Sequence, residues 1–275
     1  NQLRPDGRIS NGCMAFATST GRGAQTRIVN VPSNHALYGE PMRKSWVAGE
    51  GNVLVSVDQD SSQIRLLANF MRDPIYTQAV ISGEEFDALH RYVGTDSHTL
   101  NAIAFGVLDE GMVVEARETQ DKSLIDACSF IRKYGKNAFY CLLFGGGDEK
   151  LAHTLKLKTS AQGKAAKNSF IDKLEGVGRL QDDLRTQFKE NRYGSGGYIS
   201  VAGGSWVWAS SEHKLLNYLL MGSEAQVQQE AICWFNSELG KRNLHGNQVL
   251  SFHDELTAEF PICEKDQGIQ LMSEM

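Results

Sequence analysis

Two short apolar runs with ionisable residues between them constrain the fold of this chain most strongly. The stretch "VLSFHDELTAEF" (249–260) has strand-forming residues on both sides of a histidine and two acids. Burying ionisable side chains beside such residues is unfavourable unless they are paired or bind a cation. The pattern therefore predicts a β-hairpin whose apex is either a solvated turn or a site at the edge of a sheet.

The length and composition are those of an ordinary globular chain. Its 275 residues suffice for one large domain or two closely joined ones, and 22% of them are charged. The net charge of −5 argues mildly against a nucleic-acid partner, although a local basic groove would be enough to bind phosphates. No apolar run reaches the roughly 18 residues of a membrane helix, so we expect no membrane partner.

The cysteines and the two ends of the sequence indicate the setting. The five cysteines lie far apart and form no C-x-x-C pair, which favours a reduced, cytoplasmic environment over a disulfide framework or a zinc site. The first residues, "NQLRPDGRIS", are not a signal peptide and lack an initiator methionine. Because the last residues also stop within a pattern, we interpret the chain as a fragment of a larger protein.

Helical patterns and strand patterns are mixed along the chain without a regular βαβ repeat. Helices are expected over 61–74 (ending at Pro74), 83–145 with breaks near Gly94 and 108–112, 166–194, 212–240 with Gly240 as its stop, and from near Glu264. A strand and a turn are expected over 11–22, a strand over 52–60, and two hairpins over 196–210 and 249–260. This mixture predicts an α+β fold.

Acids stand at the end of one strand and at the apex of one hairpin. Asp58 follows an apolar strand, whereas Asp254 and Glu255 are neighbours in the hairpin. Adjacent residues of an extended chain point to opposite faces, so we expect only one of the two, Asp254, to share a site with Asp58 easily. Two such carboxylates repel unless cations bridge them, and Mg²⁺ is the usual bridge. A helix-flanking aspartate and a solvated turn are the plain alternatives.

A stripe of cations and aromatic residues lies within 130–150. Arg132, Lys136, Tyr140 and Phe144 recur every four residues and so share one helical face. Such a face can hold a polyphosphate with its cations and stack a base and sugar on its aromatic rings. The plain alternative is an amphipathic helix with aromatic residues in the core and cations in solvent. No G-x-x-x-x-G-K-[ST] motif is present, so this is not a P-loop enzyme.

Three segments, taken in order, resemble the motifs of the family A DNA polymerases. They are "DQDSSQIRLLANFMRDP" (motif A), "RKYGKNAFYCLLFGGGDEK" (motif B) and "FHDEL" (motif C). Secondary segments agree: "TGR" at 20–22, "DSHTLNAIA" at 96–104 and "LLNYLL" at 215–220. The resemblance covers about residues 6–262, and "FGGGDEKL" is most similar to the bacteriophage replicative branch.

The resemblance implies a polymerase palm with an antiparallel sheet, helical fingers and no thumb. Residues 1–75 would be the N-terminal part of the palm with motif A, 76–195 the fingers with motif B, and 196–275 the C-terminal part of the palm with motif C. The implied activity is template-directed DNA synthesis, in which dNTPs are added to a primer 3′-hydroxyl by two-metal-ion phosphoryl transfer. The whole protein would be a larger viral replicative enzyme in the host cytoplasm.

The resemblance also implies a role for each matching residue. Asp58, Asp254 and the backbone carbonyl of Gln59 would hold two Mg²⁺ ions, for which Mn²⁺ could substitute, and Glu255 would be the weaker catalytic acid. The dNTP would be bound by His98 and Arg132 at its β- and γ-phosphates, Lys136 near the α-phosphate, Tyr140 at its sugar and base, and Phe144 near the templating position. The primer-template contacts would come from Arg22, Asn217 and His253.

The sequence departs from the family pattern at three positions. Gln63 replaces a glutamate of motif A, and Phe144 replaces the tyrosine whose hydroxyl holds that glutamate. The two changes agree, because an amide is less costly to bury than a carboxylate without its donor, and we expect Gln63 still to exclude a 2′-hydroxyl by its size. Met221 stands where a primer-contacting glutamine is usual. Without a thumb, DNA grip would be weak and a processivity factor would lack its docking site.

Three other interpretations compete with this one. A single-subunit RNA polymerase shares the palm, but its motif C typically has HDS where this chain has HDE. A nucleic-acid-binding module with a dead centre would not need both Asp58 and Asp254. A two-metal nuclease would use paired acids but has no use for the stripe from Arg132 to Phe144.

The phenol of Tyr140 generates a test by chain-terminating nucleotides. Because its hydroxyl can substitute for a missing 3′-hydroxyl, we expect dideoxynucleotides to terminate synthesis efficiently. The measurement is the incorporation of each ddNTP relative to its dNTP on a primed template. Strong discrimination against ddNTPs would contradict the placement of Tyr140 at the sugar.

Overall fold

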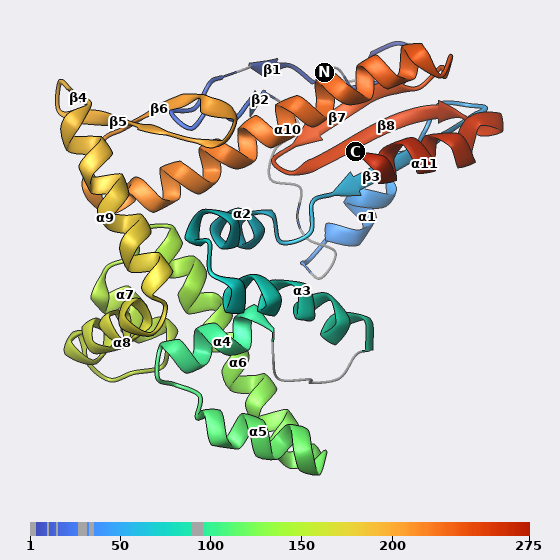
Figure 1. The fold of residues 1–275 in the computed structure, drawn as a ribbon. Helices are drawn as coiled ribbons and strands as arrows, with labels where there is room; N and C mark the ends of the chain where they lie inside the picture. Colours follow the sequence, from blue (N-terminus) through green and yellow to red (C-terminus); the bar gives the residue numbers. More distant parts are fainter. Residues whose placement is uncertain (1–3, 10, 15, 27–31, 33–35, 90–95) are drawn as a thin grey trace. The chain divides into compact units, whose positions relative to one another are not determined.

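The structure, a computed structural model, describes residues 4–9, 11–14, 16–26, 32, 36–89 and 96–275 (Figure 1). Its helices and antiparallel sheets confirm the predicted α+β class. The chain forms two compact units. The first contains Asn1–Ser62, Val201–Val207 and Met221–Met275, and the second contains Gln63–Ser200 and Trp208–Leu220. The assignment of 1–75 and 196–275 to a palm and of 76–195 to fingers stays a prediction.

Eight strands are described, and they form three antiparallel sheets. One pairs β1 (Cys13–Met14) with β2 (Ala24–Gln25). The second has the order β3 (Asn52–Asp58), β8 (Glu255–Pro261), β7 (Asn247–Phe252). The third has the order β4 (Arg192–Tyr193), β5 (Gly196–Ser200), β6 (Trp206–Ala209), with both Gly203 and Gly204 at positive φ in the turn of the predicted hairpin.

The sheet of β3, β8 and β7 has one apolar face and one polar face. Val57 of β3 lies opposite Leu256 of β8, and the next pair along is Asp58 opposite Glu255. Because successive side chains alternate between the faces of a strand, the valine–leucine pair and the acid pair face opposite sides. The period-2 pattern of the sequence therefore directs the acids away from the core.

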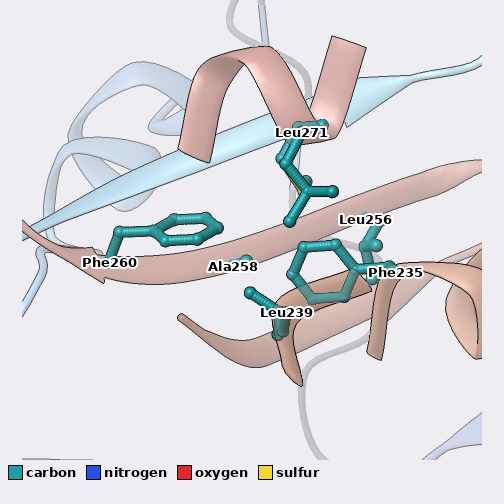
Figure 2. Packing of buried hydrophobic residues seen from close by; sticks show 7 residues of the cluster. Phe235, Leu239, Leu256, Ala258, Phe260 and Leu271 are labelled. Atoms are coloured by element: carbon teal, nitrogen blue, oxygen red, sulfur yellow. The ribbon is translucent and has the colours of Figure 1, made fainter. Parts of the chain in front are cut away.

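The core of the first unit lies where α10 and α11 pack on this sheet (Figure 2). Its buried members are Phe235, Leu239, Leu256, Ala258, Phe260, Leu271 and Met272. Phe260 meets Phe235 edge-on, with 6.3 Å between ring centroids. A Cβ atom added to Gly246 or Gly268 would lie 2.3 or 2.8 Å from the nearest atom of the Phe260 ring. The absence of a side chain at these two glycines makes room for the phenylalanine.

The second unit is mostly helical, and the first unit also contains helices. The described helices are α1 (Gly39–Lys44), α2 (Ser62–Met71), α3 (Pro74–Leu89), α4 (Ser97–Ala104), α5 (Glu110–Thr119), α6 (Lys122–Leu143), α7 (Asp148–Thr154), α8 (Ser160–Lys173), α9 (Glu175–Glu190), α10 (Leu215–Lys241) and α11 (Lys265–Glu274). Aspartate side chains cap α4, α5 and α6 at Asp96, Asp109 and Asp121. None of the helices in these described ranges is long and apolar enough to cross a membrane.

The core of the second unit joins α4, α5 and α6. Its fully buried members include Ala102 and Cys128, and Gly135 of α6 lies against Ala102 so closely that a Cβ would be 2.6 Å from the alanine Cβ. Phe105 stacks on Phe170 of α8 with 4.3 Å between ring centroids. These contacts hold α4 firmly against α6, the two helices that carry the candidate phosphate-binding residues.

The helix boundaries differ from prediction at several places. The predicted helix 83–145 is interrupted at Gln120 (φ 55°), between α5 and α6. Pro74 begins α3 instead of only ending the previous helix, because proline suits a first helical position and Asp73 accepts hydrogen bonds from the next two N–H groups. The predicted helix 166–194 is interrupted at Leu174 (φ −112°, ψ 71°), between α8 and α9. Gly240 does not stop α10, which ends at Lys241 before Asn243 turns with φ 53°.

The predicted helical breaks within 83–145 have different outcomes. The break predicted around 108–112 is found between α4 and α5, where Asp109 caps the N-terminus of α5. The one near Gly94 lies outside the described residues.

Truncating Phe260 tests the core of the first unit. Phe260→Ala should lower the free energy of unfolding by about 3–5 kcal/mol, because the two glycines beside the ring cannot fill the cavity. Ile262→Ala is the matched control, since Ile262 is 66% exposed and its loss should change stability by about 0.5 kcal/mol or less. Urea unfolding followed by circular dichroism measures both, and equal effects would contradict the packing in Figure 2.

Candidate active site

The structure brings the predicted acids together at the end of the β3–β8 pair. Asp58 is the last residue of β3 and lies opposite Glu255, the first residue of β8. Asp254 is in the turn before β8, and its carbonyl accepts a hydrogen bond of 3.2 Å from the N–H of Gln59. Loss of solvent around the carboxylate raises the pKa of Asp58, and the charges of Asp254 and then Glu255 raise it further. The three acids therefore repel one another across the strand ends.

Strand alternation does not decide which of Asp254 and Glu255 lies near Asp58, because both do. The sequence led us to expect that only one of them could easily share a site with Asp58. Instead, the register sets Glu255 directly opposite Asp58, and the charges of both acids act on the pKa of Asp58. The reason is that His253 has φ 57°, so the chain at the apex is not extended and the alternation rule does not hold there. Glu255 also accepts a hydrogen bond of 2.7 Å from Ser56.

The donors at this strand end suit a hard cation. Carboxylate and carbonyl oxygens are the ligands that Mg²⁺ prefers, and the mutual repulsion of Asp58 and Asp254 is what a cation would relieve. In the ranges that the structure describes, no three His, Cys, Asp or Glu side chains are grouped as a metal-binding cluster. The carboxylates of Asp58 and Asp254 and the Gln59 carbonyl are the groups that would hold a cation here, with water or phosphate oxygens as further ligands.

Arg22 and His253 lie beside the same hairpin. Arg22 forms an ion pair with the buried Glu224, and Ser62 also donates a hydrogen bond to that carboxylate. Burial lowers the pKa of Arg22, whereas the charge of Asp254 opposes this change. The pKa of His253 is lowered by burial and by the charge of Arg22. The first unit thus gathers two predicted primer-template residues around the acids.

A second group of predicted residues is held together by Asp96, which is fully buried at the N-terminus of α4. Its carboxylate accepts hydrogen bonds from the N–H groups of His98 (3.0 Å) and Thr99 (3.3 Å) and from the Thr99 hydroxyl (2.6 Å). Arg132 of α6 donates its Nε at 2.8 Å and places its Nη2 at 2.7 Å from the same carboxylate oxygen. Asp96 therefore fixes the arginine of α6 to the first turn of α4.

His98 is buried between these helices and is neutral at neutral pH. Burial lowers the pKa of its imidazole to about 4, and the charges of Arg132 and Lys136 act in the same direction. Its ring centroid lies 6.3 Å from that of Tyr140. Its Nδ1 is buried without a hydrogen-bond partner among the described residues.

The stripe on α6 fits a plain amphipathic face only in part. That alternative puts the cations in solvent and the aromatic rings in the core. Instead, the Arg132 side chain is only 17% exposed, and Phe144, which follows the last residue of α6, is 51% exposed. The rings of Tyr140 and Phe144 stack at 6.3 Å with an interplanar angle of 20°. Lys136 is exposed on the same face.

Two other predicted residues lie elsewhere in the second unit. Gln63 is in the first turn of α2, Asn217 is in the first turn of α10, and both are half-buried. Met221 follows Asn217 by one helical turn in the same helix. The roles expected for Gln63 and Asn217 stay predictions.

Sequence reasoning missed three polar residues that hold the predicted ones. They are Asp96, Glu224 and Gln228. An aspartate directly before a helical pattern signals a cap, and this signal was available for Asp96. The four-residue spacing of Glu224 and Gln228 was also visible, but it carries no information on which distant segments the two side chains meet.

Comparisons with known proteins agree with the motif order. The model of DNA polymerase family A matches residues 1–275. DNA polymerase I of Mycobacterium leprae is 25% identical over 280 residues, which cover 97% of this chain and 28% of that protein. The DNA polymerase of Mycobacterium phage L5 is 26% identical over 229 residues, or 82% of this chain and 31% of that protein.

A solved structure gives the corresponding fold. The POL domain of Pol1 from M. smegmatis, in complex with DNA primer-template and dNTP, has a TM-score of 0.77 at 23% identity, and the match covers 100% of this chain and 45% of that chain. The likeness supports the predicted polymerase fold.

This chain belongs to DNA polymerase family A. The assignment argues against the single-subunit RNA polymerase that the sequence left open. The chain spans less than a third of the length of the M. leprae and phage L5 relatives, at 28% and 31%.

Replacing Asp96 tests the joint between α4 and α6. Asp96→Asn removes the buried anion that faces Arg132, so we expect the free energy of unfolding to fall by about 3–5 kcal/mol. Asp109→Asn is the matched control, because Asp109 is an exposed cap of α5 with one N–H donor at 2.9 Å and asparagine caps equally well. Urea unfolding measures both variants. A loss of stability as small as that of the control would contradict the role of Asp96.

Proposed function

We propose that this chain is the polymerase part of a template-directed DNA polymerase, which adds dNTPs to a primer 3′-hydroxyl by phosphoryl transfer. The observation that carries the proposal is the meeting of Asp58 with Asp254 and Glu255 at one strand end, in a chain that the family model matches along its whole length. The separate group around Arg132 supplies the chemistry that a triphosphate needs.

The first unit would provide the reaction centre. Asp58, Asp254 and the carbonyl of Gln59 would hold two Mg²⁺ or Mn²⁺ ions, which stabilise negative charge on the transferring phosphoryl group when bound. The β3–β8 ladder keeps the two strands from moving apart, so the carboxylates are oriented before substrate arrives. Glu255 is directed back along the strands by Ser56, which supports a secondary role for it.

The second unit would bind the incoming nucleotide. Arg132 and Lys136 supply positive charge for the triphosphate, and Asp96 orients the arginine. A pKa of about 4 leaves His98 uncharged at neutral pH, so its part would be a hydrogen bond to a phosphate oxygen. The stacked Tyr140 and Phe144 offer a flat surface for sugar and base.

Primer-template DNA and dNTP are the partners we propose. The related POL domain of Pol1 was solved with both, and Arg22 and His253 beside the acids would contact the primer end. Asn217 would join them, and Gln63 would exclude ribonucleotides. The bacteriophage branch, the cytoplasmic setting and a processivity factor stay predictions, although one phage polymerase is among the relatives.

Loss of Asp254 tests the proposed function. Mg²⁺-dependent extension of a primed template by this chain should fall by about a thousandfold or more in Asp254→Asn, because the amide keeps the size but not the charge of the metal ligand. Asp266→Asn, an exposed change in the same unit, is the control and should keep wild-type rates.

Extension, degradation and binding separate the alternatives. A nuclease would shorten the primer instead of extending it. A binding module would bind primer-template with equal affinity in wild type and Asp254→Asn but would extend it in neither. Extension that persists in Asp254→Asn would contradict the role of the hairpin.

A further inference from the structure

Helix α10 carries two buried polar residues one turn apart, Glu224 and Gln228. Their exposed fractions are 2% and 4%. Residues four positions apart on a helix share one face, so the two form a short polar stripe. A carboxylate buried to this degree destabilises a protein unless a cation or several donors surround it. The partners of Glu224 and Gln228 therefore indicate the role of these two residues.

Glu224 is held by Arg22 and Ser62. The guanidinium pairs with the carboxylate, and the serine hydroxyl donates to it. The Arg22 side chain is 14% exposed, so this is a largely buried ion pair. On the same helix, Gln229 donates its Nε2 to the carbonyl of Gly21 at 2.9 Å. Helix α10 thus holds two neighbouring residues of the loop, Gly21 and Arg22.

Gln228 joins the two acid-bearing segments. Its Oε1 accepts a hydrogen bond of 2.8 Å from the side chain of Gln59, which follows Asp58. Its Nε2 donates at 3.3 Å to the carbonyl of Glu255, which follows Asp254. One face of α10 therefore contacts the Arg22 loop and both segments that carry the acids.

Arg22 is close enough to Asp254 for their charges to interact. The charge of Asp254 raises the pKa of Arg22 against the effect of burial. The pKa of His253 is lowered by the charge of Arg22 and raised by that of Asp254. A guanidinium beside a carboxylate forms strong paired hydrogen bonds when it can turn toward it. A carboxylate occupied in this way has fewer oxygens available to a cation. Glu224 offers Arg22 a different, buried carboxylate.

We propose that Glu224 is a positioning residue that holds Arg22 in a buried ion pair and so leaves the Asp254 carboxylate to a divalent cation. The inference rests on the proposed function, in which Asp254 binds that cation. The same ion pair fixes the direction of Arg22 at the place where the primer end would lie. Glu224 itself touches neither the cation nor the substrate.

Direct binding of Mn²⁺ to the chain, followed by the EPR signal of the free ion, tests this without turnover. Glu224→Gln keeps the size of the side chain but removes its charge, so Arg22 pairs with Asp254 and Mn²⁺ affinity should fall roughly fivefold. Glu230→Gln is the matched control, because it removes the same charge from an exposed position of the same helix. Its affinity should stay at the wild-type value.

The double variant Arg22→Gln/Glu224→Gln distinguishes positioning from general support of the fold. Without the arginine nothing competes for Asp254, so Mn²⁺ affinity should return to the wild-type value. Unchanged affinity in Glu224→Gln, or a double variant as weak as the single one, would overturn the proposal. Should Glu224→Gln fail to fold, Glu224→Asp keeps the charge on a shorter side chain and should lose affinity about twofold; no loss there would overturn the proposal equally.

The Asp254→Asn variant distinguishes a failure of this inference from a failure of the proposed function. Wild-type binding of Mn²⁺ that disappears in Asp254→Asn supports the proposed function whatever Glu224→Gln does. If wild type binds no Mn²⁺ at Asp254, the proposed function and this inference fail together. If wild type and Glu224→Gln bind it equally, only the role of Glu224 fails.

Discussion

Seven residue pairs join β3 to β8, from Asn52 opposite Pro261 to Asp58 opposite Glu255. This ladder decides which side chains enter the core and which acids meet at its end. Because the alternation of faces is fixed by the register, a slip of one residue would move every core side chain to the polar face and carry the acids into the core. The apolar packing on α10 and α11 therefore also holds the acids Asp58 and Glu255 in place.

Buried acids paired with arginines hold the segments that the sheets do not reach. In the described residues, each buried aspartate or glutamate has an arginine partner. Arginine suits this use because its planar guanidinium stays charged and can bond a carboxylate at two points. Such pairs are sensitive to mutation, since the loss of the arginine leaves a buried carboxylate without its partner charge. The pairs are Asp96–Arg132, Glu224–Arg22 and Glu259–Arg8.

Much of the fold could be predicted from local sequence patterns, but the contacts between distant segments could not. The strand before Asp58, the hairpin around Asp254 and the helix of Arg132 follow from period and spacing, and the structure contains all three. The interruption at Leu174 was missed because the helical pattern continues through it. The relation of Asp254 to Glu255 was misjudged because the positive φ of His253 cannot be inferred from alternation. The partners of Arg132 and Arg22 depend on tertiary packing, which spacing along the sequence does not encode.

The ring of Phe260 between two glycines has a consequence for how this chain can evolve. A side chain at Gly246 or Gly268 is excluded only while a large ring occupies position 260. A relative with a smaller residue there would be free to carry alanine or serine at either glycine position and could refill the space that the ring vacates. The three positions should therefore vary as a group among relatives, although 246 lies in the loop before β7, 260 in β8 and 268 in α11. Selection would act on the volume they share and not on any one of them.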